Sequence, residues 1–218
     1  MPLEQSLPNA DDRPRSMREA GVRERRRAML HQPHVELLTS YVAKLRQRGS
    51  GEVPEFDPLD GGVDARVLFL FEKPGPMTAR GGKRVGSGFI SRNNDDSTAE
   101  ATLDFMKRAG ISRRLTVTWN LIPWWNGTRK VTGQELRDGL ECLHELIALL
   151  LRLRAVVLVG QHAARAEHYI KQNHPKLRLF TSAHPSPLVR AKLPDRWNEI
   201  PVKWAEVLEF IDDAEGSA

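Results

Sequence analysis

Four short runs of apolar and β-forming residues recur through the middle and the end of the chain. They are V-L-F-L-F at 67–71, L-T-V-T-W at 115–119, A-V-V-L-V at 155–159 and L-R-L-F-T at 177–181. Continuous runs of this length are typical of strands that are covered on both faces. We therefore expect four buried strands over these ranges.

Helical patterns lie between and around these runs. Two of them begin at a capping box, formed by Ser97 with Glu100 and by Thr132 with Glu135. Strands that alternate with helices indicate an α/β fold with a parallel sheet and helices on both of its faces. Apolar spacing and boundary residues place helices at about 33–48, 97–109, 132–151, 163–172 and 202–210.

The N-terminal part of the chain has a different composition. Residues 1–32 are rich in Arg, Pro and Asp and poor in apolar residues, and they contain the run R-E-R-R-R at 23–27. This composition is typical of a solvated arm, and contact with nucleic acid phosphates is the alternative. We expect a basic N-terminal extension with one helix over 1–50 and the main domain over 51–218.

Charge and cysteine content narrow the class of protein. The 218 residues carry a net charge of +5, which fits a polyanionic partner but also ordinary solubility. Cys142 is the only cysteine, so the chain holds neither an intramolecular disulfide nor a cluster bound by four of its own thiolates. No apolar stretch approaches the roughly 20 residues of a membrane span, and the polar start has no signal-peptide pattern. We expect an intracellular, cytoplasmic protein associated with the nucleoid.

The unusual segments follow the predicted strands directly. They are E-K-P-G-P at 72–76, N-L-I-P-W-W-N at 120–126, G-Q-H-A-A at 160–164 and S-A-H-P-S-P-L at 182–188. In an open parallel sheet the carboxyl ends of the strands form the binding site, so these segments are expected to converge on one edge. A glycine-rich stretch at 80–89 belongs to the same edge, although it has no phosphate-binding fingerprint.

The last of these segments is stiffened by two prolines. His184 and Ser186 each precede a proline, which disfavours helical backbone and keeps the chain extended. A histidine fixed in this way can donate a hydrogen bond to a developing anion. Leu188 on a rigid tip can fill a gap in a base stack. A proline-rich surface loop is the alternative.

The set of segments resembles the uracil-DNA glycosylase superfamily. A-H-P-S-P-L is similar to its second signature motif and E-K-P-G-P to its first, and the order and spacing agree from about residue 65 to 210. The resemblance implies a three-layer α/β/α sandwich with a central four-stranded parallel sheet. It also implies an enzyme that hydrolyses the N-glycosidic bond of a uracil flipped out of DNA, leaving an abasic site. DNA is then the partner, the protein is a monomer, and no metal or cofactor is needed.

The same resemblance assigns roles to single residues. His184 donates to O2 of the departing uracil, and Asn120 pairs with N3–H and O4. Phe89, in G-S-G-F-I-S at 86–91, stacks on the base, and Leu188 is the wedge. The remaining contacts are assigned to Pro74 and Gly75 at the base and to Ser186, Pro187, Lys83 and Arg84 on the DNA.

The first motif departs from the family at Lys73, where relatives carry Asp, Asn or Ala, and at Phe71, where Gly is usual. A lysine cannot activate water as an aspartate does. Lys73 could turn away to bind phosphate, attack the sugar as a nucleophile with lyase activity, or mark a weak or inactive enzyme. Glu72, Asp95 or Asp96 could supply the missing carboxylate, and Glu72 is our preferred catalytic partner of His184.

These residues predict a monofunctional DNA-repair glycosylase for uracil or a related deaminated base. The subfamilies with the most similar motifs carry four cysteines for an iron–sulfur cluster, which this chain lacks. The rival is a catalytically weak or inactive DNA- or damaged-base-binding protein on the same fold. A third interpretation, a hydrolase of free nucleosides, needs neither a wedge such as Leu188 nor a basic arm. The sequence leaves the preferred base and strand undetermined.

Overall fold

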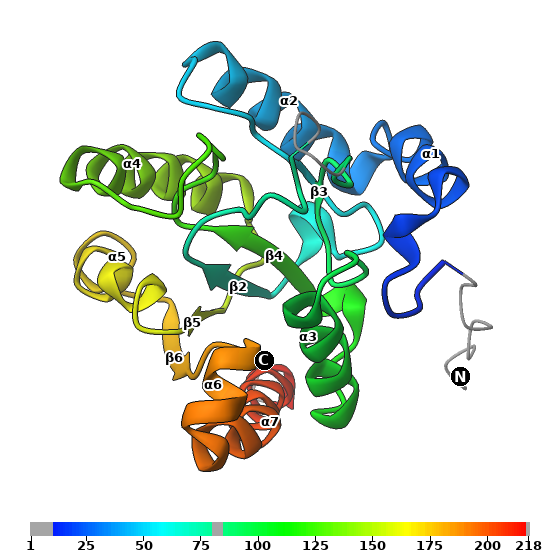
Figure 1. The fold of residues 1–218 in the computed structure, drawn as a ribbon. Coiled ribbons are helices and arrows are strands. Elements are labelled where there is room, and N and C mark those ends of the chain that lie inside the picture. Colours follow the sequence, from blue (N-terminus) through cyan, green and yellow to red (C-terminus); the bar gives the residue numbers. More distant parts are fainter. Residues whose placement is uncertain (1–10, 80–84, 217–218) are drawn as a thin grey trace.

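A four-stranded parallel sheet forms the centre of the molecule. The computed structural model describes residues 11–79 and 85–216, drawn in Figure 1. The strand order is β4-β2-β5-β6, and every pairing is parallel. The predicted strands are confirmed, two of them shifted by one residue: β2 (Val67–Phe71), β4 (Thr116–Asn120), β5 (Ala155–Val159) and β6 (Arg178–Ser182).

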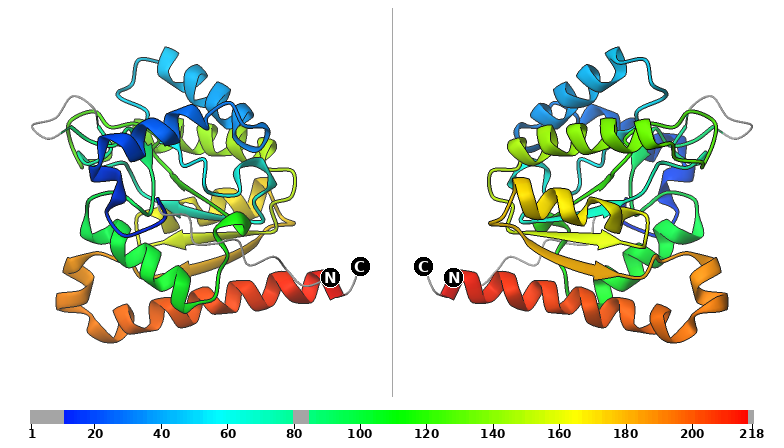
Figure 2. Two further views of the ribbon diagram at one scale, coloured as in Figure 1. Left: turned by 90° about the vertical axis from the view of Figure 1, so that its right-hand side faces the viewer. Right: turned by 90° about the vertical axis from the view of Figure 1, so that its left-hand side faces the viewer.

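Helices cover both faces of this sheet, so the predicted three-layer α/β/α sandwich is confirmed. The α-helices are α1 (Ala20–Ala28), α2 (Pro33–Gln47), α3 (Ser97–Arg108), α4 (Gly133–Leu149), α5 (Glu167–Asn173), α6 (Pro187–Lys192) and α7 (Pro194–Gly216). Helices α2, α4 and α5 share a hydrophobic core with one face of the sheet, and α3 and α7 share a core with the other. Figure 2 shows the sheet edge-on between these two layers.

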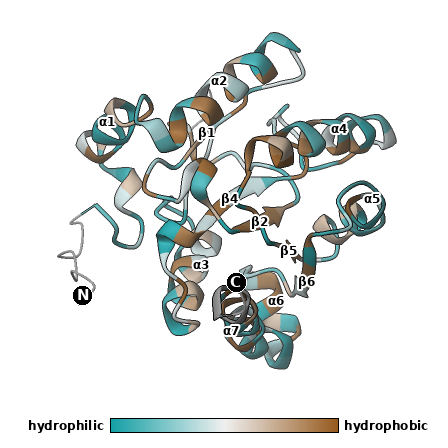
Figure 3. Ribbon diagram, turned by 180° about the vertical axis from the view of Figure 1, so that it is seen from behind, coloured by the Kyte–Doolittle hydropathy of each residue, from teal (hydrophilic) through white to brown (hydrophobic). Residues whose placement is uncertain are grey.

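Alternation along β2 explains the two cores. Leu68 and Leu70 pack into the core on the α2 and α4 side, whereas Val67, Phe69 and Phe71 pack into the core on the α3 and α7 side. Successive side chains of a strand point to opposite faces, so a strand that is apolar throughout needs a cover on each face. Figure 3 shows the apolar stripes of the helices turned toward the sheet and their polar sides turned outward.

Helix α7 is longer than the pattern predicted. A start after Pro201 was expected because proline removes a helical hydrogen bond and is favoured in a first turn. The helix instead begins at Pro194 and continues through Pro201. Ile200, Trp204 and Val207 are fully buried against the sheet, and this packing stabilises the helix across the proline. Within the described residues, no helix is both long enough and apolar enough to cross a membrane.

Several short elements were not predicted, because two to four residues carry no hydrophobic period. Strands β1 (Glu55–Phe56) and β3 (Phe89–Ile90) pair in parallel outside the main sheet. The 3₁₀ turns are η1 (Ser16–Arg18), η2 (Gly62–Asp64), η3 (Arg113–Leu115) and η4 (Ala163–Ala166), of which the last replaces the start of the helix expected from residue 163.

The expectation of a solvated arm is wrong for residues 11–32. Arg26 on α1 is fully buried and forms an ion pair with Asp57, which is also fully buried. Arg25 pairs with Asp11, and Arg23 donates to two main-chain carbonyls. The arginines of the 23–27 run are thus largely engaged within the protein, and α2 after them packs into the main core.

Candidate active site

The carboxyl ends of the strands meet at one edge of the sheet, where a cavity of about 410 Å³ opens. Phe71 at the end of β2 is in register with Asn120 at the end of β4, and both border the cavity. The cavity wall comes from the segments at 71–78, 90–99 and 184–188, with Thr102, Thr118, Asn120 and Arg129. Of the four predicted segments, only 160–164 contributes no wall residue, although Gly160 packs against His184.

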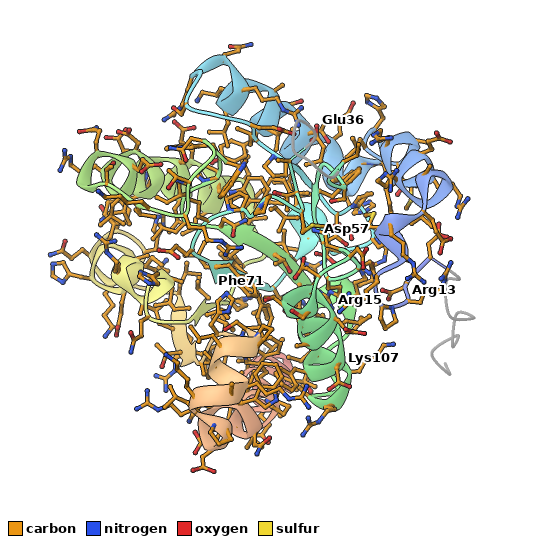
Figure 4. All side chains as sticks on the ribbon, viewed as in Figure 1. Arg13, Arg15, Glu36, Asp57, Phe71 and Lys107 are labelled. Carbon is orange, nitrogen blue, oxygen red and sulfur yellow. The ribbon has the colours of Figure 1, made fainter. Side chains whose placement is uncertain are left out.

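His184 is held between an aromatic ring and a glycine. Its imidazole meets the Phe71 ring edge-on, with ring centroids 5.6 Å apart and planes at 89°. Gly160 has φ +86°, and a Cβ built there would lie 3.0 Å from the His184 Cβ. The Ser186 N–H donates to the His184 carbonyl at 2.8 Å and fixes the turn into α6. Figure 4 labels Phe71 near the centre of the molecule, where this packing occurs.

The environment of His184 keeps its imidazole neutral. Burial lowers the pKa of His184 to about 4, and the nearby Arg129 and His162 add to the shift. Loss of hydration disfavours the charged form of a histidine, and neighbouring positive charge acts in the same direction. At neutral pH this side chain is therefore a neutral N–H donor rather than a cation or a strong acid.

Asn120 presents a carboxamide to the cavity. The side chain is 6% exposed at the last position of β4. It makes no hydrogen bond to the part of the chain that the structure describes, and neither of its polar atoms is sealed from the cavity. One donor group and one acceptor are thus available side by side, as recognition of an N–H next to a carbonyl requires.

Glu72 places a carboxylate on the cavity wall. Its Oε1 lies 3.0 Å from Nδ1 of His162, and the side chain is 29% exposed. Asp96 also borders the cavity, but its Oδ1 accepts from the Ala99 N–H as the N-cap of α3. Both carboxylates thus reach the site, and Glu72 retains more freedom to contact water.

Lys73 borders the cavity, and its amine contacts residues at and before the N-terminus of α4. Its Nζ lies 2.7 Å from the Glu135 carboxylate, 2.8 Å from the Asn126 Oδ1 and 3.2 Å from the Lys130 carbonyl. The side chain is only 3% exposed. Because a protonated amine has three hydrogens to donate, these three acceptors occupy it fully. This geometry disfavours the nucleophile hypothesis and the phosphate-ligand hypothesis for Lys73, because protein acceptors engage the amine.

The stacking role expected of Phe89 is contradicted. Phe89 is fully buried with Met17, Val22 and Leu30 and does not border the cavity. Neighbouring side chains of a strand face opposite ways. Ile90, the residue after Phe89 in β3, therefore borders the cavity instead. The Phe89 ring packs instead against the N-terminal segment, whose folding against the domain was not predicted.

The remaining predicted contacts border the cavity or fall outside the described residues. Pro74, Gly75, Ser186 and Pro187 border the cavity, as does Leu188, which is 61% exposed. The Ser186 hydroxyl accepts from the Val189 N–H at 3.4 Å and so caps α6. Their contacts with DNA stay predictions. Lys83 and Arg84 fall within 80–84, outside the described residues.

Three kinds of wall residue were missed by sequence reasoning. Arg129 reaches the wall beside Gly75, and its charge acts on His184. Its place in the loop after Asn120 was the available signal. Phe71 was noted only as a departure, yet it packs on the catalytic candidate. Polar residues of the inner wall, among them Thr118, lie inside a strand or a loop where no motif marks them. In the residues described, no three His, Cys, Asp or Glu side chains gather as a metal site would require.

Comparison with known proteins agrees with this arrangement. The family model described as the uracil DNA glycosylase superfamily matches residues 58–206, which span the sheet and every wall segment named above. No curated protein matches the chain. The match covers well over half of the sequence, and the chain belongs to the uracil DNA glycosylase superfamily, whose members are in general DNA glycosylases that act on DNA in base excision repair.

Proposed function

We propose that this protein hydrolyses the N-glycosidic bond of uracil, or of a related deaminated base flipped out of DNA, and leaves an abasic site. The observation that carries the proposal is that a neutral His184 and an open Asn120 carboxamide border the same cavity. A flipped base needs such an enclosed site, because its reacting bond is inaccessible inside the duplex. We propose that the enzyme acts as a monomer without metal or cofactor.

The chemistry follows from the charges that develop. As the bond between the sugar C1′ and the base nitrogen breaks, its electron pair leaves with the base, and water adds to C1′. His184 donates its N–H to O2 of the departing uracil and stabilises that anion. A neutral N–H suits this role, because it stabilises the anion by a hydrogen bond and keeps its own proton. Asn120 holds N3–H and O4 and so orients the ring.

Arg129 and Glu72 complete the proposed site. The guanidinium of Arg129 beside Gly75 and His184 adds positive charge where the leaving base or the adjoining phosphate becomes negative. Glu72 accepts a hydrogen bond from the attacking water and favours the cationic sugar. Lys73, held by Glu135, takes no part in the reaction, so the enzyme is monofunctional.

The test is cleavage of a labelled oligonucleotide that carries one uracil, single-stranded or paired with G or A, in EDTA. Abasic sites are read as strand breaks with and without alkali. We expect breaks only after alkali and a loss of at least about 100-fold in rate for His184→Ala, the scale of one catalytic hydrogen-bond donor. His168→Ala is the control, because His168 is exposed on α5 and does not border the cavity.

One observation favours a second function, a damaged-base-binding protein without turnover. The first motif lacks an aspartate, and the lysine in its place is bound to Glu135. This alternative would be supported if the wild type bound uracil-containing DNA specifically but formed no abasic product. His184→Ala should then bind the same DNA equally well, again without product.

A further inference from the structure

Glu72, the carboxylate proposed to contact the attacking water, has a hydrogen-bond partner outside the cavity. Its Oε1 lies 3.0 Å from Nδ1 of His162, a residue that does not border the cavity. Within the part of the chain that the structure describes, His162 is the only polar partner of the Glu72 side chain. Because a carboxylate has two accepting oxygens, Oε2 stays available to a further donor such as water.

The direction of this hydrogen bond follows from the chemistry of the two groups. An ionised carboxylate has no hydrogen to donate, so the hydrogen between the two side chains belongs to Nδ1 of His162. A neutral imidazole can carry its hydrogen on either nitrogen, and the contact with Glu72 selects the form with the hydrogen on Nδ1. A protonated ring also carries a hydrogen at Nδ1, so the bond forms in both charge states.

Other contacts fix the backbone of both partners. The Glu72 carbonyl accepts from the Ile122 N–H at 2.8 Å, which ties the loop after β2 to the loop after β4. His162 lies in the turn after β5, directly before η4. In this turn the Gly160 carbonyl accepts from the Ala164 N–H at 3.1 Å. The two side chains thus start from fixed points and meet between two loops.

The turn after β5 also supports His184. Gly160 packs against the His184 side chain, and a Cβ at Gly160 would lie 3.0 Å from the His184 Cβ. Two residues later in the same turn, His162 contacts Glu72. One short segment therefore contacts both groups on which the proposed hydrolysis depends.

The stability of the fold does not explain the pair of Glu72 and His162. The two side chains are 29% and 67% exposed, respectively. Ion pairs and hydrogen bonds between such exposed groups contribute little to stability, because water competes for both partners. Orientation matters far more at a reacting centre, where a displacement of about 1 Å can lower a rate about 100-fold.

We propose that His162 is a positioning residue: its Nδ1–H holds Oε1 of Glu72, so that the other oxygen faces the attacking water. This inference rests on the proposed function and adds a residue outside the cavity to the same site. The Glu72 side chain is long and flexible, and without His162 it would spread over several rotamers. Only some of these rotamers bring an oxygen to the water.

The test compares asparagine and leucine at position 162. The amide nitrogen of asparagine is attached to Cγ, as Nδ1 of histidine is, so it can donate from nearly the same place. Leucine has the same branched shape without a donor. In single-turnover excision of uracil, we expect His162→Asn to stay within about threefold of the wild type. His162→Leu should be about tenfold slower, the effect of one lost hydrogen bond to a charged group.

Two controls separate positioning from binding and from folding. The enzyme concentration that gives half the maximal rate should be the same for the wild type and both variants, because His162 does not hold the DNA in this inference. The melting temperatures of His162→Asn and His162→Leu should also agree, because the side chain is exposed. A weaker grip on DNA in His162→Leu with an unchanged maximal rate would contradict the inference.

A double variant shows whether His162 acts through Glu72. Glu72→Ala has no carboxylate to position, so adding His162→Leu to it should lower the rate no further. A further loss of about tenfold in this background would mean that His162 acts on the DNA or on His184 by itself, and the inference would fall.

The state of the His162 ring gives a readout that needs no activity. Ring-nitrogen chemical shifts, measured at about pH 8 where an ordinary histidine is neutral, should place the hydrogen of His162 on Nδ1. Glu72→Ala should abolish this preference, and His162→Asn identifies the signals by their loss. A hydrogen on Nε2 in the wild type would contradict the proposed contact.

Two further results separate this inference from the proposed function. Equal rates for the wild type and His162→Leu, or a loss in His162→Asn as large as in His162→Leu, would overturn the inference and leave the proposed function standing. An absence of uracil excision by the wild type would overturn both.

Discussion

At the scale of single residues, the site depends on the surroundings of His184. The Phe71 ring, the missing side chain of Gly160 and the two prolines fix one orientation of the imidazole. The same burial that orients the ring also keeps it neutral. A preorganised neutral donor needs no rearrangement when the base becomes an anion.

The lowered pKa of His184 makes stability depend on pH. Its value of about 4 lies below the 6.5 of an ordinary histidine, so between these values the unfolded chain binds more protons. The stabilising effect of the neutral form is complete above pH 6.5 and is lost as the pH falls toward 4. From about pH 7 to pH 5, the free energy of unfolding should fall by about 2 kcal/mol more for the wild type than for His184→Gln. Urea unfolding at both pH values checks this, and equal losses would contradict it.

Gly160 tests whether the position of His184 matters. A Cβ at this glycine would lie 3.0 Å from the His184 Cβ, so Gly160→Ala should displace the imidazole and lower single-turnover excision at least about tenfold. Gly49→Ala is the control, because Gly49 also has a positive φ, +69°, but has nothing within 4 Å of the added Cβ. Equal rates for the two variants would show that contact with His184 is unimportant.

At the scale of elements, the loop after β2 is connected to the start of α4. Lys73 donates to Glu135, the residue whose other oxygen accepts the Thr132 N–H in the capping box. Trp124 Nε1 also lies 3.3 Å from the Glu135 Oε1. Although burial opposes it, the hydrogen bond from Lys73 lowers the pKa of Glu135. One carboxylate thus joins the loop after β2, the loop after β4 and the start of α4.

Lys73→Met should therefore destabilise the protein, but it should not abolish excision, because Lys73 is not the nucleophile in this account. Loss of the buried charged hydrogen bonds lowers the free energy of unfolding by about 2 kcal/mol. The matched control is Lys171→Met, because Lys171 pairs with Glu167 on α5 but is 63% exposed and should contribute less than about 0.5 kcal/mol. Borohydride should trap no covalent complex of the wild type with DNA. A trapped complex that disappears in Lys73→Met would contradict this structural role.

Periodicity made the main elements predictable, and long-range packing decided the rest. The runs at 67–71 and 155–159 read as buried strands because every position is covered. The capping box at Thr132 and Glu135 fixed a helix start. The side-chain direction of Phe89 could not be read, because it depends on α1 and η1 packing across a two-residue strand. The binding of Lys73 to Glu135 joins positions far apart in the chain, and no local pattern records it.

At the scale of the whole molecule, the N-terminal segment is part of the site's support. A buried charge network connects this segment to the domain. Asp57, labelled in Figure 4, pairs with Arg26 and Arg113, and Arg113 also pairs with Asp60. Although burial opposes it, Arg113 and Arg26 hold the pKa of Asp57 at about 2. Asp57 also accepts from the Ser91 hydroxyl, on the segment that forms a cavity wall.

Two adjacent arginines of α1 test this support. Arg26→Met leaves a buried carboxylate without one of its cations and should lower the free energy of unfolding by about 3 kcal/mol or more. Arg25→Met removes a pair whose arginine is 60% exposed, and it should lower the free energy of unfolding far less than Arg26→Met. Denaturant unfolding of both variants checks the difference. Equal effects would mean that the N-terminal segment does not stabilise the domain.

The most direct test of the central claim is single-turnover excision of uracil by the wild type, His184→Ala and Lys73→Met under one set of conditions. The account predicts alkali-dependent breaks for the wild type and a rate lowered at least about 100-fold in His184→Ala. Lys73→Met, measured below its melting temperature, should stay within about tenfold of the wild type. A His184→Ala rate equal to that of the wild type, or a complete loss in Lys73→Met with His184→Ala still active, would contradict the account.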